Sequence, residues 1–290
     1  MNPLFITWNV SPVLFEIGSL SIRWYGILFA FAFVISYILL KKMFIKEKVS
    51  VYYLEKLTLY IFIGLIAGLR LGHCLFYEFD YYISHPIEMF LPIKETASGW
   101  KFIGYQGLAS HGGAIGILIA TFFYCRKTKI PYLWIIDRLV IAICFAGAAV
   151  RIGNLMNSEI YGVATTLPWG FIFVRDNQTI PCHPTQIYEA LSYIILGIFL
   201  YSYIMKSKTA PKAGFIFGIF LIGLFTARFL IEFLKNNQEA WESTMPLNMG
   251  QLLSLPFIIA GIIILILSMK YQLGKNLNLS ILNKNNTTKK

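Results

Sequence analysis

The sequence predicts an all-α integral membrane protein with about seven transmembrane helices. Its 290 residues are 57% hydrophobic and only 13% charged, with a mean hydropathy of +0.64, which is too apolar for a soluble domain of this length. Several apolar stretches reach the roughly 20 residues that a helix needs to cross about 30 Å of hydrocarbon. The cations also fall in alternate connections between these stretches.

Seven spans follow one another in order, at 22–40, 55–78, 111–125, 132–151, 186–205, 213–234 and 250–269. The third has the weakest helix start, because Gly112, Gly113 and Gly116 disfavour a helix. We expect one membrane domain over residues 1–270. The Asn- and Lys-rich tail, residues 271–290, is expected to be disordered.

The net charge of +11 indicates membrane topology and not nucleic-acid binding. Each segment that follows an odd-numbered span is basic: Lys41, Lys42, Lys46 and Lys48; Arg126, Lys127 and Lys129; Lys206, Lys208 and Lys212; and Lys270, Lys275, Lys284, Lys289 and Lys290. The remaining connections hold few cations. By the positive-inside rule, the N-terminus lies outside and the C-terminus is cytoplasmic.

This orientation places most membrane-embedded polar residues in the outer half of their spans. They are Arg23 and Tyr25, Arg70 and His73, His111, Arg151, Gln186 and Glu189, and Arg228 and Glu232. Ionisable groups at membrane depth are costly and usually functional. We therefore expect one cavity, open to the outer leaflet, to gather them, under a small cap formed by the external segments 79–109 and 155–185.

Structural explanations compete with functional ones for several charges. Arg23 and Arg70 lie near span ends, where arginines commonly extend to the interface. Arg228 lies about 20 Å from the cytoplasmic edge at 1.5 Å per residue, and its alternative is an ion pair with Glu232 one turn later. Asp137 and Arg138, nearer the cytoplasm, are expected to pair structurally.

The segment from Arg151 to Gly162 concentrates a cation, two amides and a carboxylate where the fourth span ends. Asn154 and Asn157 would share one helical face with Arg151 if the helix continues. The alternative is a polar helix end that the amides cap, but capping would require neither Glu159 nor Gly162.

His111, in Ser-His-Gly-Gly at a helix start, is a candidate general base, because histidine moves protons near pH 7. A structural histidine is the alternative. Two arginines and a histidine facing the outer leaflet call for an anion, and a phospholipid headgroup supplies one. Arginine suits phosphate because its planar fork donates two parallel hydrogen bonds.

The pattern Arg-x-x-Asn-x-x-Asn-x-Glu-x-x-Gly is met by Arg151, Asn154, Asn157, Glu159 and Gly162. Further motifs are Arg-Trp-Tyr-Gly from residue 23, Arg-Leu-Gly from 70, Ser-His-Gly-Gly from 110, His-Pro-Thr-Gln-x-Tyr-Glu from 183, Arg-Phe-x-x-Glu-Phe from 228 and Met-Gly-Gln-x-x-Ser-x-Pro from 249. With these motifs, about residues 20–260 resemble the bacterial prolipoprotein diacylglyceryl transferases.

The resemblance implies transfer of the diacylglyceryl group of phosphatidylglycerol to the lipobox cysteine of a preprolipoprotein signal peptide, with glycerol phosphate leaving. It implies a monomeric multi-pass enzyme of the bacterial inner membrane, with its active site facing the periplasm and no metal or other cofactor. Arg151 and Arg228 would stabilise charge on the phosphate, and His111 or Glu159 would take the thiol proton. The expected phosphatidylglycerol site comprises Arg151, Tyr25, Asn154, Asn157, Gly162, Arg70, Gln186 and Glu232.

One position departs from the family pattern. Members often carry a tyrosine four residues before the arginine of the sixth span, where this chain has Leu224. Any role of that hydroxyl is lost here or taken over by a neighbour, for which Tyr105 and Tyr188 are candidates.

Two other classes of protein compete with the transferase. A transporter or channel would distribute charges through the whole membrane depth and show internal pseudo-symmetry, and the clustering in the outer half argues against it. A non-catalytic lipid-binding scaffold would need the arginines but neither the histidine nor the paired amides.

Overall fold

The structure is a computed structural model that describes residues 5–18, 20–91, 93–96, 99–102, 107, 109–236, 242 and 245–271. The chain divides into two compact units, and each is described by itself. Unit 1 comprises Met1–Glu47 and Ile136–Lys275, and unit 2 comprises Lys48–Ile135 and Asn276–Lys290. The single domain of residues 1–270 stays a prediction. All of the predicted tail except Tyr271 lies outside the described residues.

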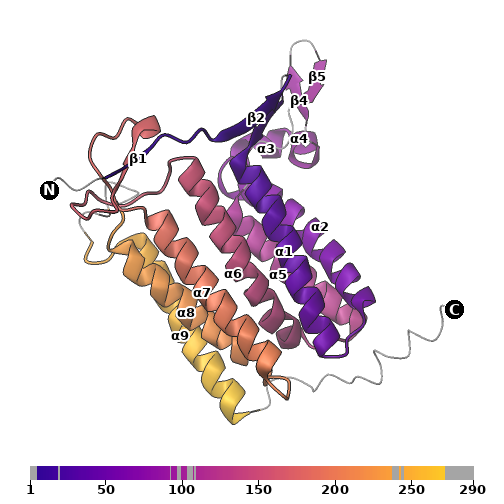
Figure 1. The fold of residues 1–290 in the computed structure, drawn as a ribbon. Helices are drawn as coiled ribbons and strands as arrows, with labels where there is room; N and C mark the ends of the chain where they lie inside the picture. The colour runs from indigo at the N-terminus through magenta and orange to yellow at the C-terminus, as the bar shows by residue number, and fades with distance from the viewer. Residues whose placement is uncertain are drawn as a thin grey trace. The chain divides into compact units, whose positions relative to one another are not determined.

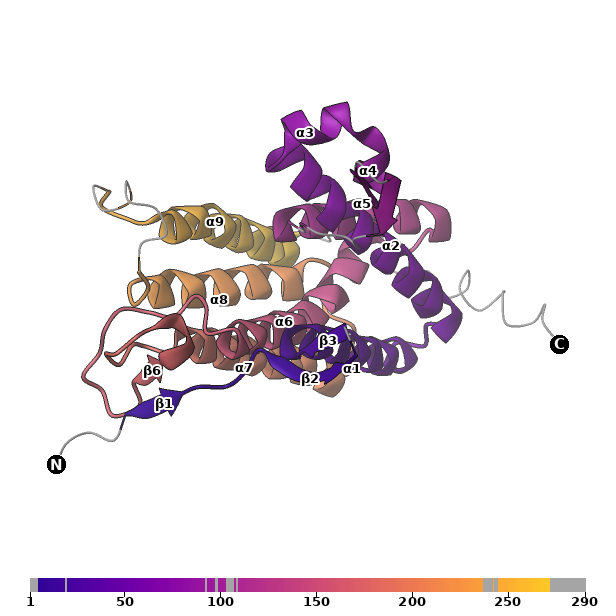
Figure 2. The same cartoon turned by 90° about the horizontal axis from the view of Figure 1, so that it is seen from above.

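Unit 1 is built on long helices. They are α1 (Trp24–Lys46), most of α6 (Tyr132–Met156), α7 (Thr185–Lys206), α8 (Phe215–Glu232) and α9 (Met249–Lys270). Helix α8 lies between α7 and α9 and packs along both, as Figures 1 and 2 show from two directions. Helix α9 begins with a capping box in which Asn248 and Gln251 exchange side-chain and backbone hydrogen bonds.

Short strands occupy one end of unit 1. Strand β1 (Ile6–Trp8) pairs in parallel with β6 (Phe171–Phe173), which the 3₁₀ helix η1 (Val174–Asp176) follows. Strands β2 (Val13–Ile17) and β3 (Leu20–Arg23) form an antiparallel hairpin that leads directly into α1, so the predicted start of the first span is a strand.

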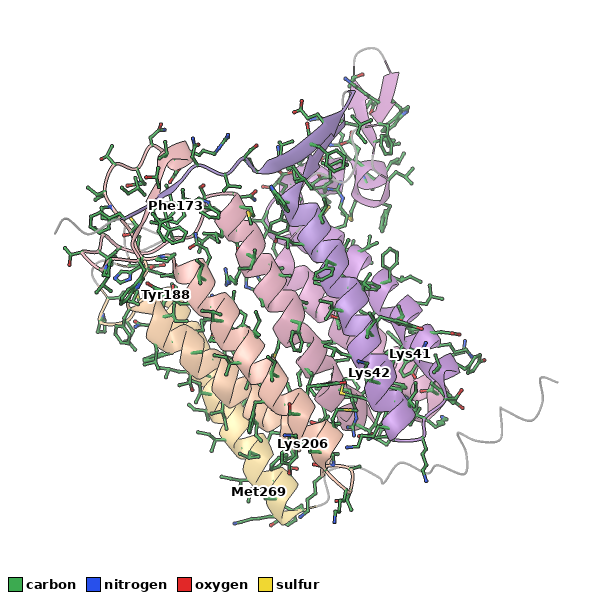
Figure 3. The ribbon with its side chains drawn as sticks, viewed as in Figure 1. Lys41, Lys42, Phe173, Tyr188, Lys206 and Met269 are labelled. Atoms are coloured by element: carbon green, nitrogen blue, oxygen red, sulfur yellow. The ribbon has the colours of Figure 1, made fainter. Side chains whose placement is uncertain are left out.

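Cations cap helix ends at the opposite end of unit 1, which we call the basal end (Glu47, 137–138 and 204–217). Lys46 Nζ donates to the Ile204 and Ser207 carbonyls where α7 ends, and Lys212 Nζ donates to Met269 O, 2.8 Å away, at the end of α9. In Figure 3, Lys41, Lys42, Lys206 and Met269 lie toward this end, away from Phe173 and Tyr188. Such contacts satisfy terminal carbonyls and complement the helix dipole.

Unit 2 is organised by α2 (Val51–Phe76) and α5 (Ser110–Thr128), which pack along each other. Its other elements are α3 (Phe79–Ser84), α4 (Pro86–Phe90) and the hairpin of β4 (Ile93–Thr96) and β5 (Gly99–Phe102). Glycines make the close packing possible: a Cβ at Gly68 would lie 2.3 Å from Gly112 O, and one at Gly116 2.0 Å from Gly64 O. Small residues spaced by four are typical of helix pairs in membranes.

Six described helices are long and apolar enough to span a membrane, namely α1, α2, α6, α7, α8 and α9. The all-α membrane fold is thus confirmed. Helix α5, which matches the predicted third span, has 19 residues but is not among these six. Helix α6 continues past the predicted end at 151 to Met156, which keeps Arg151 and Asn154 on helical backbone. The orientation in the membrane and a cap shared by both external segments stay predictions.

Candidate functional site

The signature segment forms a chain of polar contacts where α6 ends. Arg151 Nη1 donates to Asn154 Oδ1 at 3.3 Å, and Asn154 Nδ2 donates to Glu159 Oε1 at 2.8 Å. Asn157 Nδ2 donates to the same Glu159 oxygen at 3.1 Å. Two amides therefore hold the carboxylate of Glu159 just beyond the helix end. We call the region of residues 151–162, 183–189 and 228–236 the site end of unit 1.

The backbone around Glu159 adopts an uncommon conformation. Ser158 and Ile160 have φ values of 58° and 60°, in the left-handed region that a β-branched residue such as isoleucine rarely occupies. Gln186, fully buried at the start of α7, donates from Nε2 to the Glu159 carbonyl at 2.7 Å. The strained turn is thus tied to α7, and strain of this kind is concentrated at functional sites.

Glu189 is the centre of a buried ion network. Its fully buried carboxylate forms an ion pair with Arg151, whose Nε lies 2.8 Å from Glu189 Oε2, and accepts a hydrogen bond from Lys235 Nζ at 3.0 Å. Lys235 also lies 3.3 Å from Glu232 Oε2. Gly250 on α9 leaves room for this carboxylate, because a Cβ there would lie 2.4 Å from Glu232 Cδ. Buried charges are tolerated when they are paired in this way.

Arg228 on α8 lies outside this network. Glu232, one turn later, pairs with Lys235, so the alternative of an ion pair between Arg228 and Glu232 is not realised. No carboxylate among the described residues lies within ion-pair distance of Arg228. The site end holds three cations, Arg151, Arg228 and Lys235, and three carboxylates, of which Glu189 and Glu232 pair with Arg151 and Lys235. Arg228 is therefore the cation of this site that an anionic ligand could pair with.

An open cavity of about 730 Å³ adjoins the signature segment within unit 1. It is lined by the end of β3 and the start of α1, including Arg23 and Tyr25, and by Asn157 and Glu159. The Tyr25 ring packs on α6 at Gly153, where a Cβ would lie 2.6 Å from Tyr25 Cδ2. Asn157 Oδ1 is buried and has no hydrogen-bond partner in the described part of the chain. This oxygen can accept a hydrogen bond from a hydroxyl group.

Gly162 fixes the loop between α6 and α7 against the start of α7 and the segment that follows α8. Its N–H donates to His183 O at 2.8 Å, and a Cβ at this position would lie 2.2 Å from Leu234 O. His183 Nδ1 lies 3.2 Å from the Tyr188 hydroxyl, which also accepts from Trp169 Nε1 at 2.9 Å. Burial lowers the pKa of His183. These contacts give Gly162 a packing role, and its part in lipid binding stays a prediction.

Arg70 and His111 both lie in unit 2. The buried guanidinium of Arg70 donates to the carbonyls of Glu88 and Met89 and lies over the Tyr82 ring. Arg70 thereby anchors α4, which favours a structural role over the predicted contact with lipid. His111 is exposed at the first turn of α5.

Within the described residues, no group of three or more histidine, cysteine, aspartate or glutamate side chains is placed to hold a metal ion.

The family model for prolipoprotein diacylglyceryl transferase matches residues 12–267. The chain belongs to this family. It is 46% identical over 261 residues to a phosphatidylglycerol–prolipoprotein diacylglyceryl transferase of Bacteroides fragilis, covering 89% of this chain and 94% of that protein. Proteins with the same name from Porphyromonas gingivalis and Tolumonas auensis are 43% and 42% identical, covering 95% and 91% of this chain and 99% and 97% of theirs.

Membership of this family agrees with the resemblance drawn from the motifs, and the apolar helices make the protein a multi-pass membrane protein. The structure brings together Arg151, Asn154, Asn157, Glu159 and Gln186 by direct contacts, and it places Tyr25 on the cavity beside them.

Lys235 is a member of the site that the sequence analysis missed. In the sequence it is one of the few cations in the connections that are not basic, and Glu232 three residues before it is the only local signal. Only the fold of the chain after α8 shows that Lys235 is buried and turned toward Glu189.

Proposed function

We propose that the protein transfers the diacylglyceryl group of phosphatidylglycerol to the thiol of a lipobox cysteine in a preprolipoprotein. The thiolate sulfur forms a bond to the glyceryl carbon that carries the phosphate ester. The bond between this carbon and oxygen breaks, the electron pair goes to the phosphate oxygen, and glycerol phosphate leaves. The reaction takes place at the periplasmic face of the bacterial inner membrane, and a monomer suffices for it.

The observation that carries this proposal is the guanidinium of Arg228. It has no carboxylate partner among the described residues, while Arg151 is balanced by Glu189. A cation inside a membrane helix is stabilised by an anion, and the phosphodiester of the lipid supplies one. Negative charge grows on this phosphate as the ester bond breaks, so preorganised cations lower the barrier.

The cavity suits the glycerol headgroup. Tyr25, Asn157 and Glu159 line it, and the unpartnered Asn157 Oδ1 is an acceptor for one of the glycerol hydroxyls. Asn154 and Gln186 act indirectly, because they hold the Glu159 side chain and backbone in place. Glu232 acts through Lys235, and Gly162 through the packing of its loop.

His111 is the proposed acceptor of the thiol proton, and Glu159 is the alternative. An imidazole is a suitable base near pH 7. Glu159 Oε1 already accepts hydrogen bonds from two amides, which leaves it less available as a base.

The test is to give the purified protein phosphatidylglycerol and a lipobox peptide, and to look for the thioether product by mass spectrometry. We expect product with the cysteine peptide and none with a serine peptide. Arg151→Ala should lower turnover by about 100-fold or more. Arg175→Ala, a matched change at an exposed arginine of η1, should keep wild-type turnover. Absence of product from the wild type, or undiminished turnover in Arg151→Ala, would contradict the proposal.

A further inference from the structure

A tyrosine on α7 lies at the level of the arginines of the site end. Tyr193 follows Glu189 by one turn and is 5% exposed. Its ring packs on α6 at Gly147, where a Cβ would lie 3.2 Å from Tyr193 Cδ2. Gly147 precedes Arg151 by one turn, so the ring of Tyr193 lies one turn below the ion pair between Arg151 and Glu189.

The Tyr193 hydroxyl is directed toward the cations. Long helical side chains lean toward the start of their own helix, and α7 starts at the site end. The hydroxyl lies within electrostatic range of both Arg151 and Arg228. A guanidinium can only donate hydrogen bonds, so it can use only the oxygen of the Tyr193 hydroxyl. The proton of the hydroxyl then remains available for an anion that lies between the two arginines.

The neighbouring residue on α8 supplies no hydroxyl at this level. Leu224, one turn before Arg228, packs against the cluster formed by Ala148, Ala190 and Tyr193. It occupies the position at which family members often carry a tyrosine. Of the two replacements considered above, Tyr188 is hydrogen-bonded near His183 and Trp169, and Tyr105 lies outside the described residues.

We propose that the Tyr193 hydroxyl donates a hydrogen bond to the substrate phosphate bound between Arg151 and Arg228. From helix α7, it supplies the hydroxyl group that Leu224 on α8 does not provide. The inference rests on the proposed reaction, since the phosphate is that of the lipid substrate. Because the group contacts the phosphate as charge develops there, removal of the hydroxyl lowers kcat more than it raises KM.

The decisive variant is Tyr193→Phe, which keeps the ring on Gly147 and removes only the hydroxyl. We expect the turnover of lipobox peptide with phosphatidylglycerol to fall about 10- to 100-fold, as for a lost hydrogen bond to a charged group. The matched control is Tyr201→Phe, the same change two turns further along α7, which should keep wild-type kinetics.

The double variant Tyr193→Phe/Leu224→Tyr tests whether the hydroxyl itself matters. Leu224 already contacts the Tyr193 cluster, so a tyrosine introduced there restores a hydroxyl from α8. We expect the kcat of the double variant to be at least tenfold higher than that of Tyr193→Phe. A purely structural role of Tyr193 would not produce this gain.

Wild-type kcat in Tyr193→Phe, or a loss in Tyr188→Phe and not in Tyr193→Phe, would overturn the inference and leave the proposed reaction intact. Absence of product from the wild type would instead contradict the proposed reaction itself.

Discussion

The two ends of unit 1 both contain buried charges, but they use them differently. At the basal end, Arg138 Nη2 lies 2.5 and 2.7 Å from the two carboxylate oxygens of Glu47. Asp137 accepts hydrogen bonds from the N–H groups of Gly214 and Phe217, both at 2.8 Å, and so caps the start of α8. Each of these three charges has a partner within the protein.

The site end is incomplete by comparison. Its ion network pairs Arg151 and Lys235 with Glu189 and Glu232, but Arg228 has no carboxylate partner in the described part of the chain, and Asn157 Oδ1 has no donor. Buried polar groups are normally satisfied, so unsatisfied ones call for an explanation. A charge cluster that is complete stabilises the fold, whereas an incomplete one indicates a ligand.

This contrast also weakens the transporter alternative. Charges occur toward both ends of unit 1, as a transport path would require. Those at the basal end, however, are engaged with each other and with the start of α8.

The largest expected effect is on stability, at the basal end. Arg138→Ala leaves the carboxylate of Glu47 without its ion-pair partner and removes the cation beside Asp137, so we expect a loss of about 3–5 kcal/mol in the free energy of unfolding. Thermal unfolding in detergent measures it. The fraction that remains folded should have wild-type kcat. Wild-type stability in this variant would contradict the structural role of the basal end.

The opposite pattern is expected for Arg228→Ala. Removal of the unpaired cation should raise the barrier to transfer by about 3–4 kcal/mol, a loss of about 100- to 1000-fold in turnover. The unfolding midpoint should change by no more than a few degrees, since no ion pair is broken. Turnover is measured by thioether formation. A variant that unfolds like Arg138→Ala but retains kcat when folded would show that Arg228 is structural.

A smaller effect, on the affinity for the lipid, is expected from a change to a residue that lines the cavity. Asn157→Ala removes the proposed acceptor for a glycerol hydroxyl and one of the two amides on Glu159. We expect a rise in KM for phosphatidylglycerol of about tenfold, as for the loss of one or two hydrogen bonds. An analogue of the lipid without the headgroup hydroxyls should bind wild type and variant equally. If the analogue bound the wild type and the variant with different affinities, Asn157 would not act through the headgroup hydroxyls.

The smallest effect concerns the strained turn. Ile160→Gly removes the side chain from a residue with φ of 60°, so we expect the free energy of unfolding to rise by about 1 kcal/mol. The turn orients the side chain of Glu159, so a more flexible turn should lower turnover, but only a few-fold. Chemical or thermal unfolding and the transfer assay measure the two changes. A loss of stability would show that the Ile160 side chain contributes packing that outweighs its backbone strain.

The sequence predicted much of this arrangement and failed at identifiable points. Hydropathy and the alternation of cations predicted the long helices, because burial in lipid demands apolar spans with satisfied backbones. The spacing of Arg151, Asn154 and Glu159 predicted their association, because it depends on a single helix end.

Contacts made by folded loops were not predictable in this way. Lys235 reaches Glu189 only because the chain turns back after α8, and Arg70 anchors α4 through carbonyl groups, which all residues share. The left-handed backbone at Ser158 and Ile160 also left no signal, since neither residue type favours it.

Lipid affinity decides whether Arg228, which has no carboxylate partner among the described residues, holds the phosphate of the substrate. Affinities for phosphatidylglycerol would be measured in neutral-lipid nanodiscs by native mass spectrometry, for the wild type, Arg228→Gln and the matched variant Arg138→Gln. We expect Arg228→Gln to bind phosphatidylglycerol about tenfold or more weakly than the wild type, as for the loss of a charged hydrogen bond, and folded Arg138→Gln to bind it like the wild type. Equal affinity of the wild type and Arg228→Gln would show that Arg228 does not bind the lipid phosphate.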